Sequence, residues 1–149
     1  MITVTHHTTA RPERVWAVLA DGWTYAAWVV GASRIRAVEG GWPRPGSRIH
    51  HSVGAWPLLL SDETVVMASE PERLIRLKAK GKGLGQAVVE VTLHDEGDRT
   101  RIEMREDAAQ GLAKLIPHPV RQALIAPRNT ETLTRLALLA ERHEEPVVV

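Results

Sequence analysis

Hydrophobic residues in the last part of the chain repeat with the period of an α-helix. Between residues 118 and 143, Leu133, Leu136 and Ala140 fall on one helical face. Charged residues such as Arg128 and Arg135 fall on the opposite side. The sequence therefore predicts a long amphipathic helix near the end of the chain.

A proline inside this predicted helix leaves its course open. Pro127 removes a backbone hydrogen bond, so we expect either a kink at this point or a main helix that begins there. Val120 and Leu124, which precede the proline, point almost opposite to Leu133 on a helical wheel. Asn129 continues the apolar line backwards, and a buried amide there requires hydrogen-bond partners.

The preceding part of the chain changes from one period to another. Residues 2–9 favour a strand, residues 11–20 a short helix begun near Pro12, and residues 23–31 a second short helix. Six segments of strand-like composition follow, over residues 33–40, 47–56, 57–70, 73–81, 87–96 and 99–107. The turns between them are short, which predicts antiparallel pairing.

Alternation assigns two faces to the predicted sheet. In residues 73–81, basic side chains alternate with Ile75, Leu77 and Ala79, and in residues 99–107 charged side chains alternate with Ile102 and Met104. The charged side is interpreted as a solvated face, with a docking site for an acidic partner as the alternative. An apolar sheet face requires a cover, and only the last helix is long enough to provide it.

Composition narrows the classes of function. With 149 residues the chain has the size of one domain, residues 1–149, and its 19 basic and 18 acidic residues argue against nucleic-acid binding. It has no cysteine, no apolar run long enough to span a membrane and no secretory leader, so a soluble cytoplasmic protein is expected. An exposed edge strand leaves a monomer or a homodimer open.

Neither a cofactor nor a metal is expected from the motifs. The glycine-rich residues 81–85 lie between two strands, without a following helix, and do not match a phosphate-binding loop. His50 and His51 are adjacent in a strand, where neighbouring side chains point to opposite faces. Because no second cluster of ligands is spaced to help them, a metal site is not predicted.

The order of these elements resembles the START/Bet v 1-like (SRPBCC) superfamily, in particular its bacterial polyketide cyclase/dehydrase and lipid-transport-like branch. The resemblance covers essentially the whole chain and rests on TTARPERVWAVLADGWTYAAW, ASEPERLIRL, DRTRIEMRED and RNTETLTRLALLAER. It implies a helix-grip α+β fold, in which a curved seven-stranded antiparallel sheet wraps a long C-terminal helix and two short helices follow strand 1. It also implies a cavity for hydrophobic or amphipathic small molecules, while the fold fixes little chemistry.

Two residues are candidates for acid–base chemistry. The alternation that directs Met104 inward also directs Glu106 inward, where a carboxylate in apolar surroundings could act as a general acid or base. The alternative is that the strand loses its regularity and Glu106 faces solvent. His51 shares a face with Ile49 and could carry protons, or it could be a hydrogen-bonded core or rim histidine.

Other polar and aromatic residues leave alternatives open. Only one of Asp62 and Glu63 can face inward, but the surrounding sequence does not alternate cleanly enough to decide which. Asn129 could meet a ligand's polar end or satisfy a core contact. Trp42 and Trp56 lie beside prolines in turns and could stack on a ligand or pack the loops.

Three functions remain open from the sequence. The first is binding of a lipid-like or ring-containing molecule in a central cavity, and the second is a cyclase or dehydratase with Glu106 or His51 as the proton carrier. The third is an interaction module that uses the basic strand face. The expected ligand-binding residues are Trp28, Trp42, Ile49, His51, Trp56, Leu77, Val91, Met104, Glu106, Asn129, Leu133 and Leu136.

Overall fold

The computed structural model describes residues 2–30, 32–53, 60–81, 85–110, 115 and 117–142. The first strand and the short helices are β1 (Ile2–Thr8), α1 (Pro12–Ala20), the 3-10 turn η1 (Gly22–Thr24) and α2 (Tyr25–Trp28). The other strands are β2 (Ala32–Val38), β3 (Arg48–Val53), β4 (Leu60–Glu70), β5 (Leu74–Gly81), β6 (Gly85–Asp95) and β7 (Thr100–Gln110). The long helix α3 (His118–Arg142) follows them.

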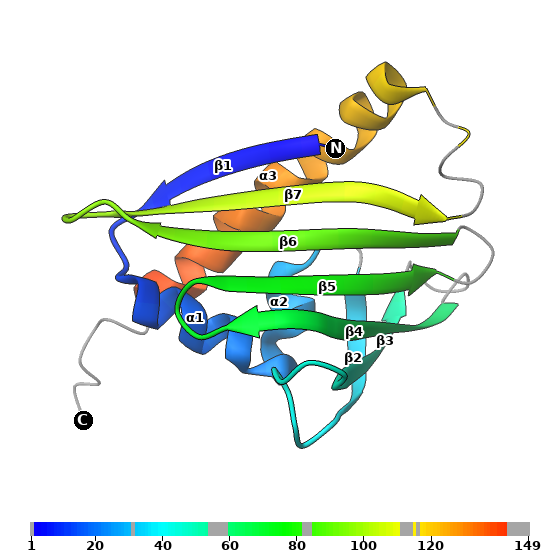
Figure 1. Cartoon of the computed structure of the whole chain (residues 1–149), viewed down its shortest axis with the longest axis horizontal. Coiled ribbons are helices and arrows are strands. Elements are labelled where there is room, and N and C mark those ends of the chain that lie inside the picture. The colour runs from blue at the N-terminus through cyan, green and yellow to red at the C-terminus, as the bar shows by residue number, and fades with distance from the viewer. Residues whose placement is uncertain are drawn as a thin grey trace.

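The strands form one antiparallel sheet of seven, in the order β1-β7-β6-β5-β4-β3-β2. Strands β2 to β7 therefore pair with their neighbours in sequence, and β1 is the edge strand that pairs with β7 (Figure 1). The short connections that the sequence predicted permit this pairing. The helices lie on one side of the sheet, with α3 running across that side and contacting β1, α1 and α2.

Helix α3 begins ahead of its proline. It runs through Pro127 from His118 to Arg142, so the alternative in which the main helix starts at Pro127 is wrong. The kink expected at this residue stays a prediction. Its buried residues begin only at Asn129, and Val120 and Leu124 are exposed. The two apolar directions of the helix therefore differ because only its second half packs on the core.

Specific contacts hold the short helices against the sheet. A Cβ on Gly22 would lie 2.7 Å from a methyl carbon of Val38, so this turn needs glycine to approach β2. The backbone N–H of Val30 donates to Thr132 of α3 over 3.2 Å. The indole N–H of Trp42 donates to the backbone carbonyl of Leu19 over 3.1 Å, which fixes the loop between β2 and β3 to α1.

The core lies between the inner face of the sheet and the three helices. Ile75, Leu93 and Ile102 of the sheet are buried in the same cluster as Leu133 and Leu136 of α3. This arrangement confirms the predicted α+β helix-grip fold, with a sheet of seven strands, two short helices after β1 and a long last helix. Burial of an alternating apolar face is the main stabilising contribution that these positions make.

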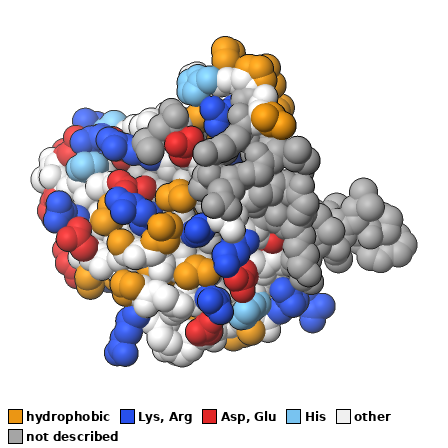
Figure 2. Space-filling model, turned by 45° about the vertical axis from the view of Figure 1, so that its right-hand side comes forward, with side chains coloured by type: hydrophobic (Ala, Val, Ile, Leu, Met, Phe, Trp, Pro, Cys, Tyr) orange, Lys and Arg blue, Asp and Glu red, His pale blue; other side chains and the backbone are white. Residues whose placement is uncertain are grey.

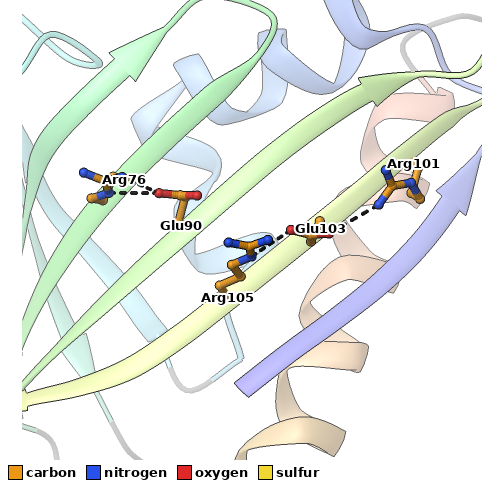
Figure 3. Close-up of polar contacts among 5 residues, drawn as sticks. All are labelled: Arg76, Glu90, Arg101, Glu103 and Arg105. Carbon is orange, nitrogen blue, oxygen red and sulfur yellow. Dashed lines mark hydrogen bonds and ion pairs between the residues drawn. The ribbon is translucent and has the colours of Figure 1, made fainter. Parts of the chain in front are cut away.

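The outer face of the sheet carries paired charges (Figure 3). Arg76 of β5 contacts Glu90 of β6 over 2.6 Å, and Glu103 lies within 3.3 Å of Arg101 and 2.8 Å of Arg105 on β7. Such partly exposed ion pairs each contribute little to stability, but they neutralise the face. The basic Arg76 on β5 is therefore opposed by an acidic side chain on the adjacent strand.

The first turns of α3 extend past the sheet. Hydrophobic side chains gather over this projecting segment at the top of Figure 2, while acidic, basic and hydrophobic side chains are interspersed over the other coloured parts of that face. Val120 and Leu124 are among the exposed hydrophobic residues. Within the described ranges, no helix is both long enough and apolar enough to cross a membrane.

Candidate functional site

The inner face of the sheet is filled at one end and open at the other. Ile75, Leu93 and Ile102, which we call the filled end, are buried. Further along two of these strands, β5 and β6, the inward positions are smaller or less covered. These positions, Ala79, Ala87 and Val89, are only partly buried and form what we call the open end.

The direction of α3 explains this difference. Thr8 donates a hydrogen bond of 2.7 Å to Glu141 near the end of α3, and Thr8 pairs with Thr100 at the start of β7. At the other extreme, Asn129 contacts Glu106 near the end of β7. The packed half of α3 therefore covers the sheet from Thr100 to Glu106, and the helix then passes beyond the open end.

One row of the inner face connects the open end to a polar cluster. Ala87 lies opposite Ala79 across the β5–β6 pair, and Ala79 lies opposite Thr64 across the β4–β5 pair. Thr64 in turn lies opposite Ile49 of β3. Directly opposite residues share one face of an antiparallel sheet, so two small side chains lead to a fully buried hydroxyl.

Thr64 is the centre of a hydrogen-bonded chain of three side chains. Its hydroxyl lies 3.1 Å from Oη of Tyr25 and 2.9 Å from Nε2 of His51. The ring of Tyr25 lies 5.2 Å from that of His51 and meets Trp28 edge to face at 5.4 Å. Helix α2 and strands β3 and β4 thus bring three hydrogen-bonded side chains together in the interior, which we call the Tyr25–Thr64–His51 chain.

Burial keeps both titratable ends of this chain neutral. It raises the pKa of Tyr25 to about 12, with further increases from Glu106 and Asp62 and opposing effects from Thr64 and Arg128. Burial also lowers the pKa of His51, against a raising effect from the backbone of Ser52. A neutral phenol and a neutral imidazole therefore face the interior at pH 7.

A buried donor beside this chain lacks a hydrogen bond. Within the described residues, Nε1 of Trp28 has no partner in hydrogen-bond geometry. The indole contacts the ring of Tyr25. Because a buried polar group without a partner is unfavourable by about 1 to 3 kcal/mol, this atom marks a place where a polar molecule would be stabilised.

A second polar cluster lies between β7 and α3. Arg128 donates to a carboxylate oxygen of Glu106, and the amide of Asn129 lies 3.5 Å from the same oxygen. Arg128 also donates to the side-chain oxygen Oδ1 of Asn129 over 3.3 Å. Glu106 is 7 % exposed and Asn129 is 1 % exposed, so both face the interior as the sequence predicted.

These contacts decide the open alternatives for Glu106 and Asn129. The alternative in which Glu106 faces solvent is wrong, because its side chain is buried. The amide of Asn129 makes core contacts with Glu106 and Arg128. Arg128 is exposed, as its place on the polar side of the helix predicts, and its guanidinium still reaches the inward carboxylate of Glu106.

Strand pairing also separates Asp62 from Glu63. Asp62 lies opposite His51 and so points to the inner face, whereas Glu63 pairs with Lys80 on the outer face at 3.3 Å. The sequence left this choice open because residues 58–66 do not alternate cleanly. The register supplies the answer that the sequence pattern lacked.

The other predicted site residues divide between core and loop. Most of them are buried in the core cluster, namely Trp28, Ile49, Leu77, Val91, Met104, Leu133 and Leu136. Trp42 is partly buried, and its hydrogen bond to Leu19 agrees with the alternative in which it packs the loop. Trp56 lies outside the described residues. Their roles as ligand contacts stay predictions, as do the catalytic roles of Glu106 and His51.

Several residues of the site were missed. Tyr25 lies in the second short helix beside more conspicuous tryptophans, of which Trp23 is in fact exposed. Thr64 could have been found from Val66 two residues later, since the two share a face. The decrease in size from Ile75 and Leu77 to Ala79 is a readable signal that β5 leaves space at its end.

Basic side chains on the outer face of the sheet have acidic neighbours. Lys80 and Arg76 each contact an acidic side chain of an adjacent strand, which agrees with the solvated-face interpretation of the basic run. Docking of an acidic partner on this face stays a prediction. Within the described part of the chain, no three histidine, aspartate or glutamate side chains are placed to hold a metal ion.

The fold and the inner-face site together define a helix-grip protein of the START/Bet v 1-like type. A family model described as polyketide cyclase/dehydrase and lipid transport matches residues 1–141. The chain therefore belongs to that family. No curated protein matches it.

Solved structures agree with the fold at low sequence identity. A START superfamily protein from Mycobacterium smegmatis is 16% identical, with a TM-score of 0.74 over 95% of this chain and 97% of that one. Ara h 8.0201 is 13% identical, with a TM-score of 0.69 over 94% and 97%. The di-domain ARO/CYC StfQ from the steffimycin biosynthetic pathway is 11% identical, with a TM-score of 0.70 over 95% of this chain and 52% of that one.

Proposed function

We propose that this protein binds a hydrophobic or amphipathic small molecule between the open end of the sheet and α3. The observation that carries the proposal is the partial exposure of Ala79, Ala87 and Val89, whereas the inward residues at the other end of β5 and β6 are buried. Small inward side chains leave room that larger ones fill elsewhere on the same strands. Apolar walls with a few convergent polar groups are typical of small-molecule sites.

The family supports this proposal without naming the ligand. Its description joins polyketide cyclases and dehydrases to lipid transport, and both chemistries require an apolar chain or ring system to be enclosed. StfQ is named as an ARO/CYC of a biosynthetic pathway, which is a statement about that protein. For this chain, enclosure of an apolar body is the property common to these descriptions.

The walls of the proposed site differ from those expected at first. Val91, Met104, Leu133 and Leu136 are closely covered by other core residues, so we assign them to the core that supports the site. The inward side chains Ala79, Ala87 and Val89 supply the wall of the ligand site. Glu106 is already engaged by two donors, so we assign it a structural role at the edge of the site.

A substitution that fills the open end tests the proposal. Leucine at position 87 adds three carbon atoms to a partly exposed inward position and should occupy the ligand's place. Wild-type protein should bind the neutral fluorescent probe N-phenyl-1-naphthylamine saturably at one site. The Ala87→Leu variant should bind it at least roughly tenfold more weakly, a change of about 1.4 kcal/mol.

Ala68→Leu is the matched control. Ala68 lies opposite Arg76 on the outer face of β4, so the same substitution there leaves the interior unchanged. Its affinity for the probe should equal that of wild-type protein. Equal affinities for all three proteins, or no saturable binding by wild-type protein, would show that the open end is not a ligand site. Native mass spectrometry of protein purified under mild conditions would then identify any retained compound in the wild-type chain.

A further inference from the structure

The Tyr25–Thr64–His51 chain indicates which polar group the ligand carries. We propose that the ligand bears an uncharged hydroxyl group, as in an alcohol, a phenol or an enol, at the end that meets this chain. The inference rests on the proposed function, because it concerns the same site. It specifies the chemical class of the ligand, which the fold leaves open.

The position of the chain places it at the end of the proposed site. Ala79 is directly opposite Thr64, and Ala87 is directly opposite Ala79. A molecule that lies over the two partly buried alanines therefore has one end beside Thr64 and the rings hydrogen-bonded to it. Tyr25 and His51 are buried, so that end is withdrawn from solvent.

The number of protons in the Tyr25–Thr64–His51 chain decides which hydrogen-bonding capacity Tyr25 has left for a ligand. The Thr64 hydroxyl has one proton, and it can accept from one neighbour while donating to the other. If His51 donates to Thr64 and Thr64 donates to Tyr25, the Tyr25 O–H is left as a free donor. If Tyr25 donates to Thr64 and Thr64 donates to His51, the Tyr25 oxygen is left as a free acceptor. A ligand hydroxyl can complete either arrangement, because it both accepts and donates.

The neighbouring indole adds a second reason for an oxygen at this place. Nε1 of Trp28 is a donor only, and within the described residues it has no hydrogen-bond partner although it is buried. Trp28 packs edge to face on Tyr25, with ring centroids 5.4 Å apart. A hydroxyl oxygen can accept from this indole and still exchange a hydrogen bond with Tyr25. A purely apolar ligand would leave both groups without a partner.

Charge disfavours an ionised ligand group at this position. Burial makes the neutral forms of Tyr25 and His51 the stable ones, so the chain offers no charge to pair with an anion. The charged groups that act on Tyr25 are Glu106, Asp62 and Arg128, of which the arginine is already paired with Glu106. Arg36 and His50 act on His51, and Arg36 lies 3.4 Å from the backbone carbonyl oxygens of His51 and Asp62.

Three probes of one shape test the inference. Naphthalene has no polar group, 1-naphthol adds a neutral hydroxyl, and 1-naphthoate carries a carboxylate at the same ring position. Equilibrium dialysis at pH 7 measures the affinity of each. We expect 1-naphthol to bind about three- to tenfold more tightly than naphthalene, which is the usual range for one net hydrogen bond, and 1-naphthoate to bind most weakly.

An isosteric variant and a matched control test whether the Tyr25–Thr64–His51 chain causes the preference for 1-naphthol over naphthalene. In Tyr25→Phe, the affinity for 1-naphthol should fall to that for naphthalene, while naphthalene binding stays unchanged and shows that the site is intact. Thr92→Val is the matched control, because Thr92 lies opposite Glu103 on the outer face. This control should keep the full preference. In nitrogen NMR spectra, the His51 ring signals should shift with 1-naphthol and remain in place with naphthalene.

The outcomes separate failure of the inference from failure of the proposed function. Equal affinities for naphthalene and 1-naphthol in wild-type protein would overturn the inference and leave a hydrophobic binding site. Tightest binding of 1-naphthoate would also overturn it, in favour of an anionic ligand. If none of the three binds, the proposed function fails and the inference fails with it. Loss of the preference in Thr92→Val would likewise contradict the assignment to the chain.

Discussion

The two ends of the inner face lie on neighbouring strands but differ in how closely they are covered. At the filled end, Ile75, Leu93 and Ile102 are closely covered, whereas at the open end Ala79 and Ala87 remain partly exposed. Along β5 and β6, the residues of both ends follow the same alternation. The difference lies in side-chain volume and in the path of α3, whose buried positions begin only at Asn129.

This comparison separates residues that stabilise the fold from residues that shape the site. A face that is mostly apolar can be a closely packed core at one end and a binding surface at the other. Apolar alternation along a strand predicts which way a side chain points, but not whether anything covers it. The cover is decided by an element distant in sequence, here the helix α3.

The largest expected contrast is in the cost of removing side-chain volume. Ile102 is fully buried at the filled end, so Ile102→Ala should lower the free energy of unfolding by about 3 to 4 kcal/mol. Val89 at the open end is only partly buried, and Val89→Ala should cost about 1 kcal/mol or less. Urea unfolding followed by tryptophan fluorescence measures both values.

A valine at the filled end controls for the difference in residue type. Val91 lies two residues from Val89 on the same face of β6 and is buried. Val91→Ala should therefore cost about 2 kcal/mol, clearly more than Val89→Ala. Equal costs for the two valine substitutions would mean that the open end is packed as tightly as the filled end, and would remove the basis for a site there.

Local patterns were sufficient to predict the architecture. The period of the last helix, the alternation of residues 73–81 and 99–107, and the short turns between strands are signals within single segments. They also predicted that Glu106 and His51 point inward, and both are buried. These features depend on the geometry of one element, which a sequence pattern records directly.

The composition of the site was harder to predict because it depends on pairing between segments. Thr64 meets Tyr25 only because β4 lies beneath α2, and the two residues are 39 positions apart in the chain. Arg128 reaches Glu106 although its Cα lies on the polar side of the helix, since a long side chain can turn back toward a buried carboxylate. Register, α3 placement and side-chain reach are all tertiary properties.

The next largest effect is the pH dependence of stability that buried Tyr25 causes. The pKa of Tyr25 is about 12 in the folded protein against 10.0 for the ordinary group, so the folded state keeps this proton longer than the unfolded chain. Stability from this group is fully present below pH 10 and is lost as the pH rises toward 12. The loss should amount to about 2 to 3 kcal/mol.

Tyr25→Phe isolates this contribution. Lysines and other tyrosine-independent groups titrate equally in both proteins, so the difference between their urea midpoints from pH 9 to pH 12 reports Tyr25 alone. The stability of the variant relative to wild-type protein should improve as the pH rises. A difference that stays constant over this range would show that the phenol is not buried in the way described.

The smallest expected effect comes from the ion pair at the edge of the open end. Arg128→Met leaves the buried carboxylate of Glu106 with only the amide of Asn129, but Arg128 is 41% exposed and its pairing is weakened by solvent. We expect Arg128→Met to lower the free energy of unfolding by about 1 kcal/mol. The double variant Glu106→Gln/Arg128→Met should recover most of this loss, because the glutamine side chain is neutral and needs no counter-charge. Chemical denaturation of the two single variants and the double variant measures the coupling. If the losses are simply additive, Glu106 and Arg128 act independently, and the open end is then bordered by two separate charged groups that a ligand could meet.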